Sequence, residues 1–318
     1  MAGQAVADPL SVRDVVARVE AMDGGVPVDP EVGFSGTKVL SLLTELGRTA
    51  TAPGVAYAEI GVYRGLSLTT VASSTSSRCV GIDNFSLFNP DGQNRRIVED
   101  AVQERGLDNI QLIDDDFEAA LEHFADHVPD HRIGLLFVDG PHDYRSQLVA
   151  LLKVLPLLAQ GGVIVVDDAN YPHVRRASRD FLATHPEFAL VMEAFTPAHP
   201  AKMTAEQERA ATAGWWNGIH VICHDPANRL GRRLPDAGDK RLFEQSHDVF
   251  RHRLSEVAFP IMQAVDRLPD EDADGRARTL DELLALAAAE RQRHPDRFDH
   301  QNTHSRDLPP FWLADPAR

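Results

Sequence analysis

The stretch V-A-Y-A-E-I-G-V-Y-R-G-L-S-L-T-T, residues 55–70, decides how the chain is expected to fold. It begins with an apolar run typical of a buried strand, passes through an acid and two glycines, and ends in a pattern typical of a helix. Gly61 and Gly65 let the backbone turn sharply and approach a ligand without a Cβ in the way, while the helix N-terminus offers unpaired N–H groups. The stretch predicts a strand, a ligand-binding turn and a helix.

The spacing of the turn narrows the ligand class. It is E-x-G-x-x-x-G, whereas a dinucleotide-binding turn has G-x-G-x-x-G around a pyrophosphate. The turn therefore suits a nucleotide-like ligand without a diphosphate, such as S-adenosylmethionine. A glycine-containing turn in any α/β protein would look the same, so the rest of the chain has to decide.

Apolar runs alternate with helical patterns along the middle of the chain. Strands that are apolar throughout and separated by helices predict a doubly wound, mostly parallel sheet covered on both faces. The expected strands are Val55–Ile60, Cys79–Ile82, Ile110–Ile113, Ile133–Val138, Val163–Val166, Phe188–Phe195 and Ile219–Cys223.

Three segments are expected along the 318 residues. Residues 1–50 form an N-terminal helical segment, residues 51–225 the ligand-binding α/β domain, and residues 226–318 a helical extension. Residues 196–218, between the last two strands, are too long for a hairpin and are expected to form a loop that acts as a lid or an interface.

Local signals mark the helices of the terminal segments. Ser11–Asp14 reads as a capping box that opens a helix, and Thr279 with Glu282 reads as another. Apolar residues between 243 and 268 follow helical spacing, with a break expected at Pro260.

Composition excludes several classes of partner. Against 32 Lys and Arg stand 48 Asp and Glu, a formal charge of -16, and no basic patch interrupts the acidity. We therefore expect neither nucleic acid nor a membrane surface as a partner. Cys79 and Cys223 lie in apolar runs without C-x-x-C spacing, and neither an export signal nor a long apolar stretch is seen. A soluble protein of the reducing cytoplasm is expected.

Acidic residues end nearly every expected parallel strand. Because ligands of open parallel sheets bind beyond the carboxyl ends of the strands, these acids are expected to share one rim. Asp83 is placed to accept the two ribose hydroxyls, or else to cap its loop. Asp116 with Phe117 is placed to meet an adenine, although Asp114 and Asp115 compete for that role. The acids are Glu59, Asp83, Asp114–Asp116, Asp139 and Asp167–Asp168.

The order of these motifs resembles a known family. E-I-G-V-Y-R-G, G-I-D, D-D-F, F-V-D-G-P-H-D-Y and G-G-V-I-V-V-D-D resemble the class I S-adenosylmethionine-dependent methyltransferases over roughly residues 35–225. D-G-x-H-x-Y, followed by a helix and an acidic pair, resembles the branch of the macrocin and mycinamicin sugar O-methyltransferases. The resemblance implies a Rossmann-like sheet of seven strands with the last strand antiparallel.

The resemblance also implies a set of site residues. Mg²⁺ would be held by Asp139, Asp167 and Asp168, and His142, three residues after Asp139, would be the catalytic base. The same loop is used without an ion in related methyltransferases, and His173 is a second possible base; Tyr144 and Tyr171 are candidates for the acceptor pocket. The implied cofactor-binding residues are Glu59, Gly61, Gly65, Asp83, Asp116, Phe117 and Asp139.

The leading hypothesis is a Mg²⁺-dependent O-methyltransferase for a hydroxylated small molecule such as a sugar or a glycosylated natural product. One alternative is a metal-independent N- or O-methyltransferase that uses His142 as the base. Another is a non-catalytic member whose helical C-terminus binds a protein. A homo-oligomer is expected in each case, with the apolar face of 243–268 as a candidate interface.

Overall fold

The computed structural model describes residues 6–237, 252 and 254–293. The chain divides into two units, Met1–Gly238 and Asp239–Arg318. The boundaries expected from the sequence, at residues 50 and 225, are a different division and stay a prediction. The apolar residues expected between 243 and 250, and the tail after Arg293, lie outside the described residues.

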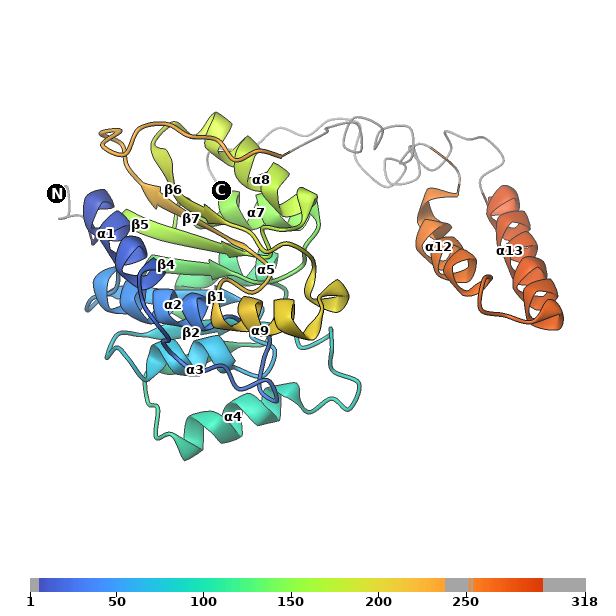
Figure 1. The fold of residues 1–318 in the computed structure, drawn as a ribbon, viewed down its shortest axis with the longest axis horizontal. Coiled ribbons are helices and arrows are strands. Elements are labelled where there is room, and N and C mark those ends of the chain that lie inside the picture. The colour runs from blue at the N-terminus through green and yellow to red at the C-terminus, as the bar shows by residue number, and fades with distance from the viewer. Residues whose placement is uncertain (1–5, 238–251, 253, 294–318) are drawn as a thin grey trace, which may run out of the picture. The chain divides into compact units, whose positions relative to one another are not determined.

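The larger unit is built on one seven-stranded sheet with the order β3-β2-β1-β4-β5-β7-β6 (Figure 1). The first five strands are parallel, while β7 runs antiparallel to both β5 and β6. This confirms the predicted fold, including the antiparallel last strand. The strands are β1 Val55–Ile60, β2 Cys79–Ile82, β3 Ile110–Ile113, β4 Arg132–Val138, β5 Leu158–Asp167, β6 Phe188–Ala194 and β7 Ile219–His224.

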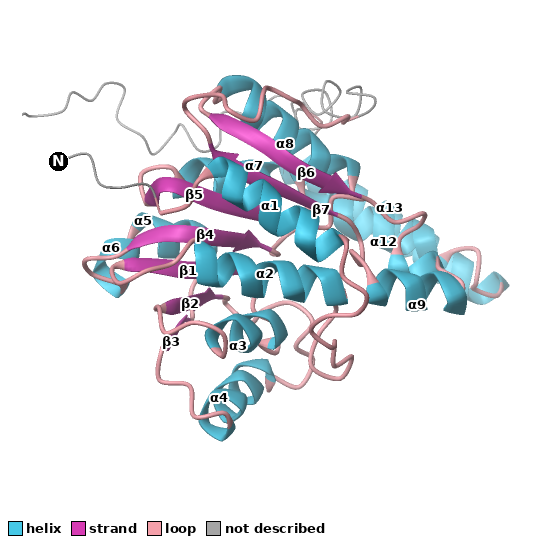
Figure 2. Ribbon diagram, turned by 60° about the vertical axis from the view of Figure 1, so that its left-hand side comes forward, coloured by secondary structure: helices cyan, strands magenta, loops and turns pink. Residues whose placement is uncertain are grey.

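Helices cover both faces of the sheet, as Figure 2 shows, and each face buries its own apolar core. Alternate residues of one strand point to opposite faces, so Tyr57 joins one core while Ala56 and Ala58 join the other. One face carries α1 Pro9–Glu20, α2 Thr37–Thr49, α3 Leu66–Ala72 and α4 Asn94–Glu104; the other carries α5 Phe117–Glu122, α6 Phe124–His127, α7 Tyr144–Val154 and α8 Pro172–Thr184.

The strand order reverses between β1 and β4. The chain moves outward from β1 to β2 and β3, and then returns to place β4 on the other side of β1. In open parallel sheets this reversal leaves a crevice at the carboxyl ends of the strands, where ligands bind. The glycine turn after β1 and the loop after β4 therefore flank the expected ligand crevice.

Three local expectations differ from the structure. The first helix begins at Pro9, capped by Asp8, and α13 (Ala273–Arg293) begins well before Thr279. Both starts were predicted from capping-box patterns in the sequence. An Asp side chain further upstream can cap a helix just as well, so the helices begin earlier than predicted. Residues 196–218 are not all loop, because they contain the 3₁₀ turn η1 Pro200–Lys202 and helix α9 Ala205–Ala213, which has a capping box of its own.

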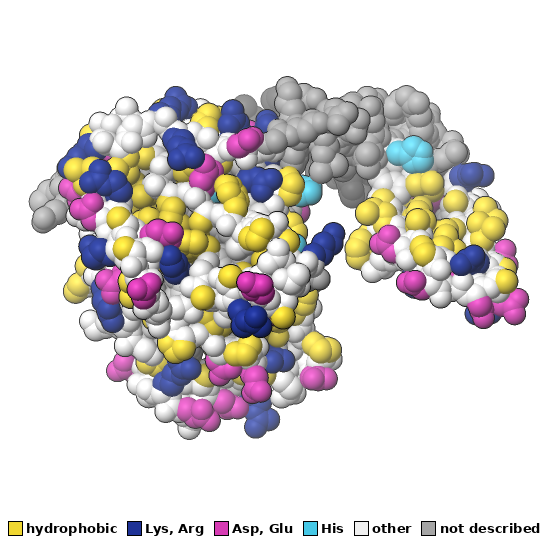
Figure 3. All heavy atoms as spheres, in the orientation of Figure 1, with side chains coloured by type: hydrophobic (Ala, Val, Ile, Leu, Met, Phe, Trp, Pro, Cys, Tyr) yellow, Lys and Arg dark blue, Asp and Glu magenta, His cyan; other side chains and the backbone are white. Residues whose placement is uncertain are grey.

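The described part of the smaller unit contains the 3₁₀ turn η2 Ser255–Val257, helix α12 Ala258–Arg267 and helix α13. Figure 3 shows apolar side chains on its surface, and Phe259, Met262 and Leu284 are among the exposed ones. On the face of the larger unit drawn there, basic and acidic side chains are interspersed. No helix in the described part of the chain is long and apolar enough to cross a membrane.

Candidate active site

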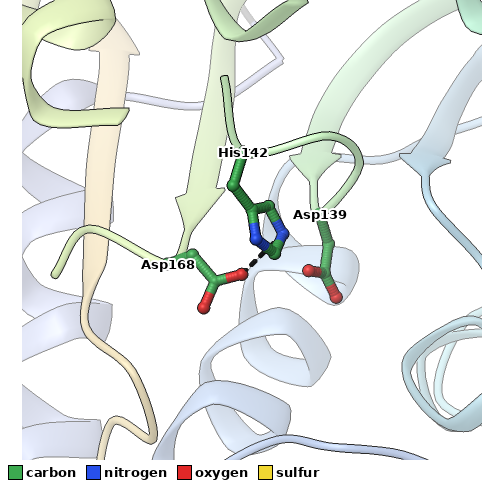
Figure 4. Close-up of side chains that lie close together, drawn as sticks. All are labelled: Asp139, His142 and Asp168. Atoms are coloured by element: carbon green, nitrogen blue, oxygen red, sulfur yellow. Dashed lines mark ion pairs between the residues drawn. The ribbon is translucent and has the colours of Figure 1, made fainter. Parts of the chain in front are cut away.

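Three side chains meet at the carboxyl ends of β4 and β5. Asp139, His142 and Asp168 each offer one ligand atom, and these atoms all lie within 4.8 Å of one another (Figure 4). His142 Nε2 lies 2.7 Å from Asp168 Oδ2. The parallel register of β4 and β5 brings together residues that are almost thirty positions apart in the sequence.

The backbone fixes each of the three residues. Asp139 directly follows β4, and its N–H donates to the Ile60 carbonyl at 2.9 Å, which ties it to the end of β1. His142 lies in the short loop before α7, whose N-cap is Asp143. Asp168 follows β5 with a φ of 58°, a left-handed conformation that Asp and Asn adopt more readily than most residues.

Asn217 is a site residue that sequence reasoning missed. Its Nδ2 donates to Asp168 Oδ1 at 2.5 Å, so that Asn217 and His142 together hold both carboxylate oxygens of Asp168. Asn217 is buried just before β7, which lies next to β5 in the sheet. The signal available in the sequence was a polar residue directly before a strand, a pattern too common to single it out.

Two carboxyl groups at this site have raised pKa values. Burial, followed by the charges of Asp167 and Asp168, raises the pKa of Asp139 well above its ordinary value. Burial, followed by Asp168, does the same to the pKa of Asp167. Carboxylates that resist ionisation in this way are stabilised by a cation placed among them.

Asp167 occupies a different position from the other two expected metal ligands. It is buried, and its Oδ1 accepts the backbone N–H of Asp168 at 2.9 Å. It does not belong to the three-residue group, in which His142 takes the third place. The structure thus brings Asp139 and Asp168 together with His142, while Asp167 bonds to the backbone of Asp168.

The turn glycines are required by packing inside the protein. Gly61 has a φ of 89°, and a Cβ there would lie 2.0 Å from the Asp139 carbonyl oxygen; one at Gly65 would meet Val98 at 3.1 Å. Gly61 lets the end of β1 pass close to the loop after β4. The ligand approach expected of both glycines stays a prediction.

Glu59 lies fully buried beneath the glycine turn. Its carboxylate accepts hydrogen bonds from the Tyr57 hydroxyl and, at 2.7 Å, from Ser67 Oγ. Burial raises the pKa of Glu59 from 4.5 to about 8, because two neutral donors compensate only in part for the lost hydration. Glu59 thus links the strand to the first turn of α3, and its assigned contact with a cofactor stays a prediction.

A pH-dependent stability follows from Glu59. Between pH 4.5 and 8 the folded protein keeps a proton that the unfolded chain releases, so this contribution is present below pH 4.5 and is lost as the pH rises through 8. Glu59→Gln should remove it. Urea unfolding at pH 6, 7 and 8 should show the wild-type free energy of unfolding falling relative to that of the variant, by about 1.4 kcal/mol per pH unit at most.

The matched control is Glu99→Gln, because Glu99 is exposed and pairs with Arg95 on the surface. Its pH profile should run parallel to that of wild type. Asp139 and Asp167 titrate alike in wild type and in Glu99→Gln, whereas the charge of Glu59 helps to raise the pKa of both, so the difference reports Glu59 together with its effect on them. Parallel profiles for Glu59→Gln and wild type would contradict the raised pKa.

Asp83 holds the glycine turn together. Its Oδ2 accepts the N–H groups of Val62 and Tyr63 at 2.8 and 2.9 Å, and its Oδ1 accepts that of Phe85 at 2.7 Å. Tyr63 has a φ of 52°, which this pairing helps to stabilise. These bonds are those of a loop-capping Asp. Since a carboxylate has about four acceptor positions, they leave room for a ribose hydroxyl.

The remaining predicted residues are placed as follows. Asp116 caps α5 by accepting the Glu118 N–H at 2.9 Å, and Phe117 behind it is buried. The Tyr171 ring lies 5.3 Å from the His142 ring, whereas the Tyr144 hydroxyl donates to Asp180 at 2.9 Å. His173 is in the first turn of α8.

Comparison with solved structures finds O-methyltransferases of low similarity. The O-methyltransferase TomG of Streptomyces achromogenes, involved in tomaymycin synthesis and solved with SAM, is 18% identical, with a TM-score of 0.45 over 68% of this chain and 89% of that one. An O-methyltransferase from Bacillus cereus, solved with SAH, is 16% identical, with a TM-score of 0.44 over 68% and 90%. Likenesses of this size do not bear on function.

A family comparison is more direct. No curated protein matches the chain in a sequence search. Residues 58–169, however, match the family model described as a methyltransferase domain. The match begins within β1, runs through the glycine turn and the loop that holds Asp139 and His142, and ends just after Asp168. The matched residues are about a third of the chain, and the three clustered side chains lie within them.

Proposed function

We propose that the protein is an S-adenosylmethionine-dependent O-methyltransferase, assisted by Mg²⁺, that acts on a hydroxylated small molecule such as a sugar or a glycosylated natural product. One observation carries the proposal. Asp139, His142 and Asp168 converge beside the strand-order reversal of a methyltransferase domain, where a proton acceptor and two carboxylates can meet an acceptor hydroxyl.

The donor is assigned to the crevice between β1 and β4. The N-terminus of α3 faces this crevice, and Asp83 fixes the intervening turn through the N–H groups of Val62 and Tyr63. A sulfonium donor is cationic and has no diphosphate, in agreement with a turn that lacks the pyrophosphate fingerprint. Asp83 is proposed to accept the ribose hydroxyls, and Asp116 and Phe117 to contact the adenine.

His142 is proposed as the base. A neutral hydroxyl is a weak nucleophile, so its proton must leave as the oxygen attacks the methyl group. The oxygen–carbon bond forms while the carbon–sulfur bond breaks, the bonding pair moves to sulfur to give neutral S-adenosylhomocysteine, and the proton goes to His142 Nδ1, because Nε2 is paired with Asp168. Asp168 orients the imidazole and stabilises the imidazolium that forms, across 2.7 Å.

The donor set fits Mg²⁺. Asp139 and Asp168 supply carboxylate oxygens, the hard ligands that this ion prefers. Burial, followed by the charges of Asp167 and Asp168, raises the pKa of Asp139, which a bound cation would lower. Asp167, whose charge also acts on Asp139, is the third proposed acid. When bound, the ion would supply Lewis-acid polarisation of an acceptor hydroxyl and lower its pKa.

A metal-independent N- or O-methyltransferase is the second candidate. The direct contact between His142 and Asp168 favours it, because a histidine already paired with a carboxylate is oriented as a base without any ion. The two candidates differ in chelator sensitivity. Complete loss of turnover in EDTA, restored by Mg²⁺, supports the first, and unchanged turnover supports the second.

The donor assignment is tested by thermal unfolding with S-adenosylhomocysteine. Ligand at 100 times its Kd should stabilise the protein by about 2.7 kcal/mol and raise its midpoint. Asp83→Ala should weaken binding by roughly tenfold or more, because the Val62 and Tyr63 N–H groups lose their acceptor. Glu99→Gln, in an exposed ion pair with Arg95, is the control. No wild-type shift at millimolar ligand would contradict the donor assignment.

A further inference from the structure

A cavity of about 290 Å³ lies between the start of α8 and the segment that follows β6. It belongs to the β5, β7 and β6 side of the sheet, whereas the proposed donor crevice lies between β1 and β4. The lining residues are Asn170, Tyr171, Arg175 and Phe195–His199.

The cavity adjoins the candidate active site through Tyr171. This side chain lines the cavity, and its ring lies 5.3 Å from the His142 ring. The Tyr171 N–H also donates to the Asp168 carbonyl at 2.9 Å, which ties the cavity wall to the acidic cluster. A molecule in the cavity is therefore separated from the proposed base by one aromatic ring at most.

The walls of the cavity are held in place by side-chain hydrogen bonds. Asn170 donates to Thr196 Oγ1 at 2.7 Å and to the Ala198 carbonyl at 3.2 Å, and its Oδ1 accepts the Thr196 N–H. The Tyr171 hydroxyl lies 2.7 Å from His199 Nε2. These bonds join α8 to the segment after β6, so the cavity is formed before a ligand arrives.

Arg175 is the cation of this cavity. Its Nη1 donates to the Ala169 and Asn170 carbonyls at 3.0 and 2.8 Å, and its guanidinium carbon lies 5.5 Å from the centroid of the Phe195 ring. Within residues 6–237, 252 and 254–293 no carboxylate pairs with it, although the chain carries 48 acids. The next arginine, Arg176, does have such a partner in Asp180, at 3.0 Å.

Hydrogen bonds within the protein use only Nη1 of the Arg175 guanidinium, which leaves its other N–H groups for a ligand. Two carbonyls occupy Nη1, while the Nε and Nη2 N–H groups have no acceptor among the described residues. Two parallel N–H groups on one edge of a guanidinium match the two oxygens of a carboxylate or phosphate. Phe195 and the two carbonyls restrict the side chain in advance, which reduces the entropy lost on binding.

We propose that this cavity binds an anionic group of the methyl acceptor, a carboxylate or a phosphate ester, and that Arg175 is the residue that selects for it. The inference rests on the proposed methyltransferase function and narrows its substrate class to acidic acceptors. Such an acceptor places its hydroxyl at His142 and its anionic group beyond Tyr171.

Matched sugars test the proposal. The probes are methyl glucoside, which is neutral, the corresponding methyl glucuronide, and glucose 6-phosphate. Each is titrated calorimetrically into the full-length protein with saturating S-adenosylhomocysteine and Mg²⁺. An anionic probe should bind at least tenfold more tightly than the neutral one. The carboxylate and phosphate arms show which group fits better.

Substitutions of Arg175 test whether this side chain causes the preference for anionic probes. Arg175→Gln should remove the preference by weakening the anionic probe about 10- to 100-fold, the usual worth of a charged hydrogen-bonded pair, while the neutral probe is unaffected. Arg175→Lys should be intermediate, because the charge remains but the fork is lost. The control is Arg179→Gln, one turn later on α8, whose Nη1 donates to the Pro235 carbonyl. It should keep the preference.

Failure of this inference is distinguishable from failure of the proposed function. If S-adenosylhomocysteine shifts the wild-type midpoint but neutral and anionic probes bind equally, or none binds at 20 mM, the acidic-acceptor proposal is overturned and the function stands. Weaker S-adenosylhomocysteine binding by Arg175→Gln would assign Arg175 to the donor carboxylate and overturn the proposal as well. Absence of any S-adenosylhomocysteine shift in wild type removes the function on which it rests.

Discussion

Asp168→Asn is expected to lower the rate of methyl transfer by about 10³-fold or more. Lewis-acid stabilisation is worth several kcal/mol, and each 1.36 kcal/mol is a factor of ten in rate. Asn is chosen over Ala because the φ of 58° at this position is tolerated by Asn and is strained for Ala. The measurement is product formation by mass spectrometry, with and without Mg²⁺.

The same variant should separate metal binding from folding. Without Mg²⁺ its thermal midpoint should stay at or above that of wild type, because one charge leaves a cluster that holds the pKa of Asp139 and Asp167 high. Mg²⁺ should raise the midpoint of wild type and leave that of the variant unchanged.

The control for Asp168→Asn is Asp143→Asn. Asp143 caps α7 from the same loop as His142 but does not belong to the cluster, and Asn caps a helix as well as Asp does. It should keep activity and the Mg²⁺ response. A fully active Asp168→Asn enzyme would contradict the proposed role of the cluster.

His142→Ala is expected to slow methyl transfer by roughly 100-fold or more, the usual worth of a positioned general base. The affinity for S-adenosylhomocysteine should change little, because His142 lies on the β4 and β5 side of the crevice. Single-turnover kinetics with saturating donor measure the methyl-transfer step directly. A loss in that step with unchanged donor binding identifies a base.

Two further measurements test the assignment of His142 as the base. His173→Gln removes the alternative base in the first turn of α8 and should stay within about twofold of wild type, since the substitution lies outside the cluster. Weakened Mg²⁺ binding by His142→Ala would show instead that the imidazole is a metal ligand, as its place within 4.8 Å of both carboxylates allows. If His173→Gln, and not His142→Ala, slows methyl transfer, the assignment of His142 as the base is wrong.

The sheet was predictable because its signals are local. β1, β2 and β3 have the bounds expected from their apolar runs, and α3 begins at Leu66 as the glycine turn predicted. Burial on both faces makes such strands apolar at every position, a pattern visible in a few consecutive residues. Helix starts were less predictable, because Asp8 caps α1 where a capping box at Ser11 seemed equally good.

The composition of the cluster was only partly predictable. The motifs placed Asp139 and Asp168 at neighbouring strand ends, where His142 joins them, whereas Asp167 accepts the Asp168 N–H and its expected role as a ligand stays a prediction. Asn217 could not be found, since it reaches Asp168 only because β7 lies next to β5.

The sequence by itself determined the order of strands and helices, the glycine turn, and the acids that end each strand, because these features depend on periodicity and turn chemistry within a few residues. Only the tertiary structure decided that Gly61 makes room for the Asp139 carbonyl, that His142 pairs with Asp168, and that Arg175 faces a cavity beside Tyr171. These contacts join segments far apart in the chain. Their geometry is set by the packing and register of the sheet, which no local pattern encodes.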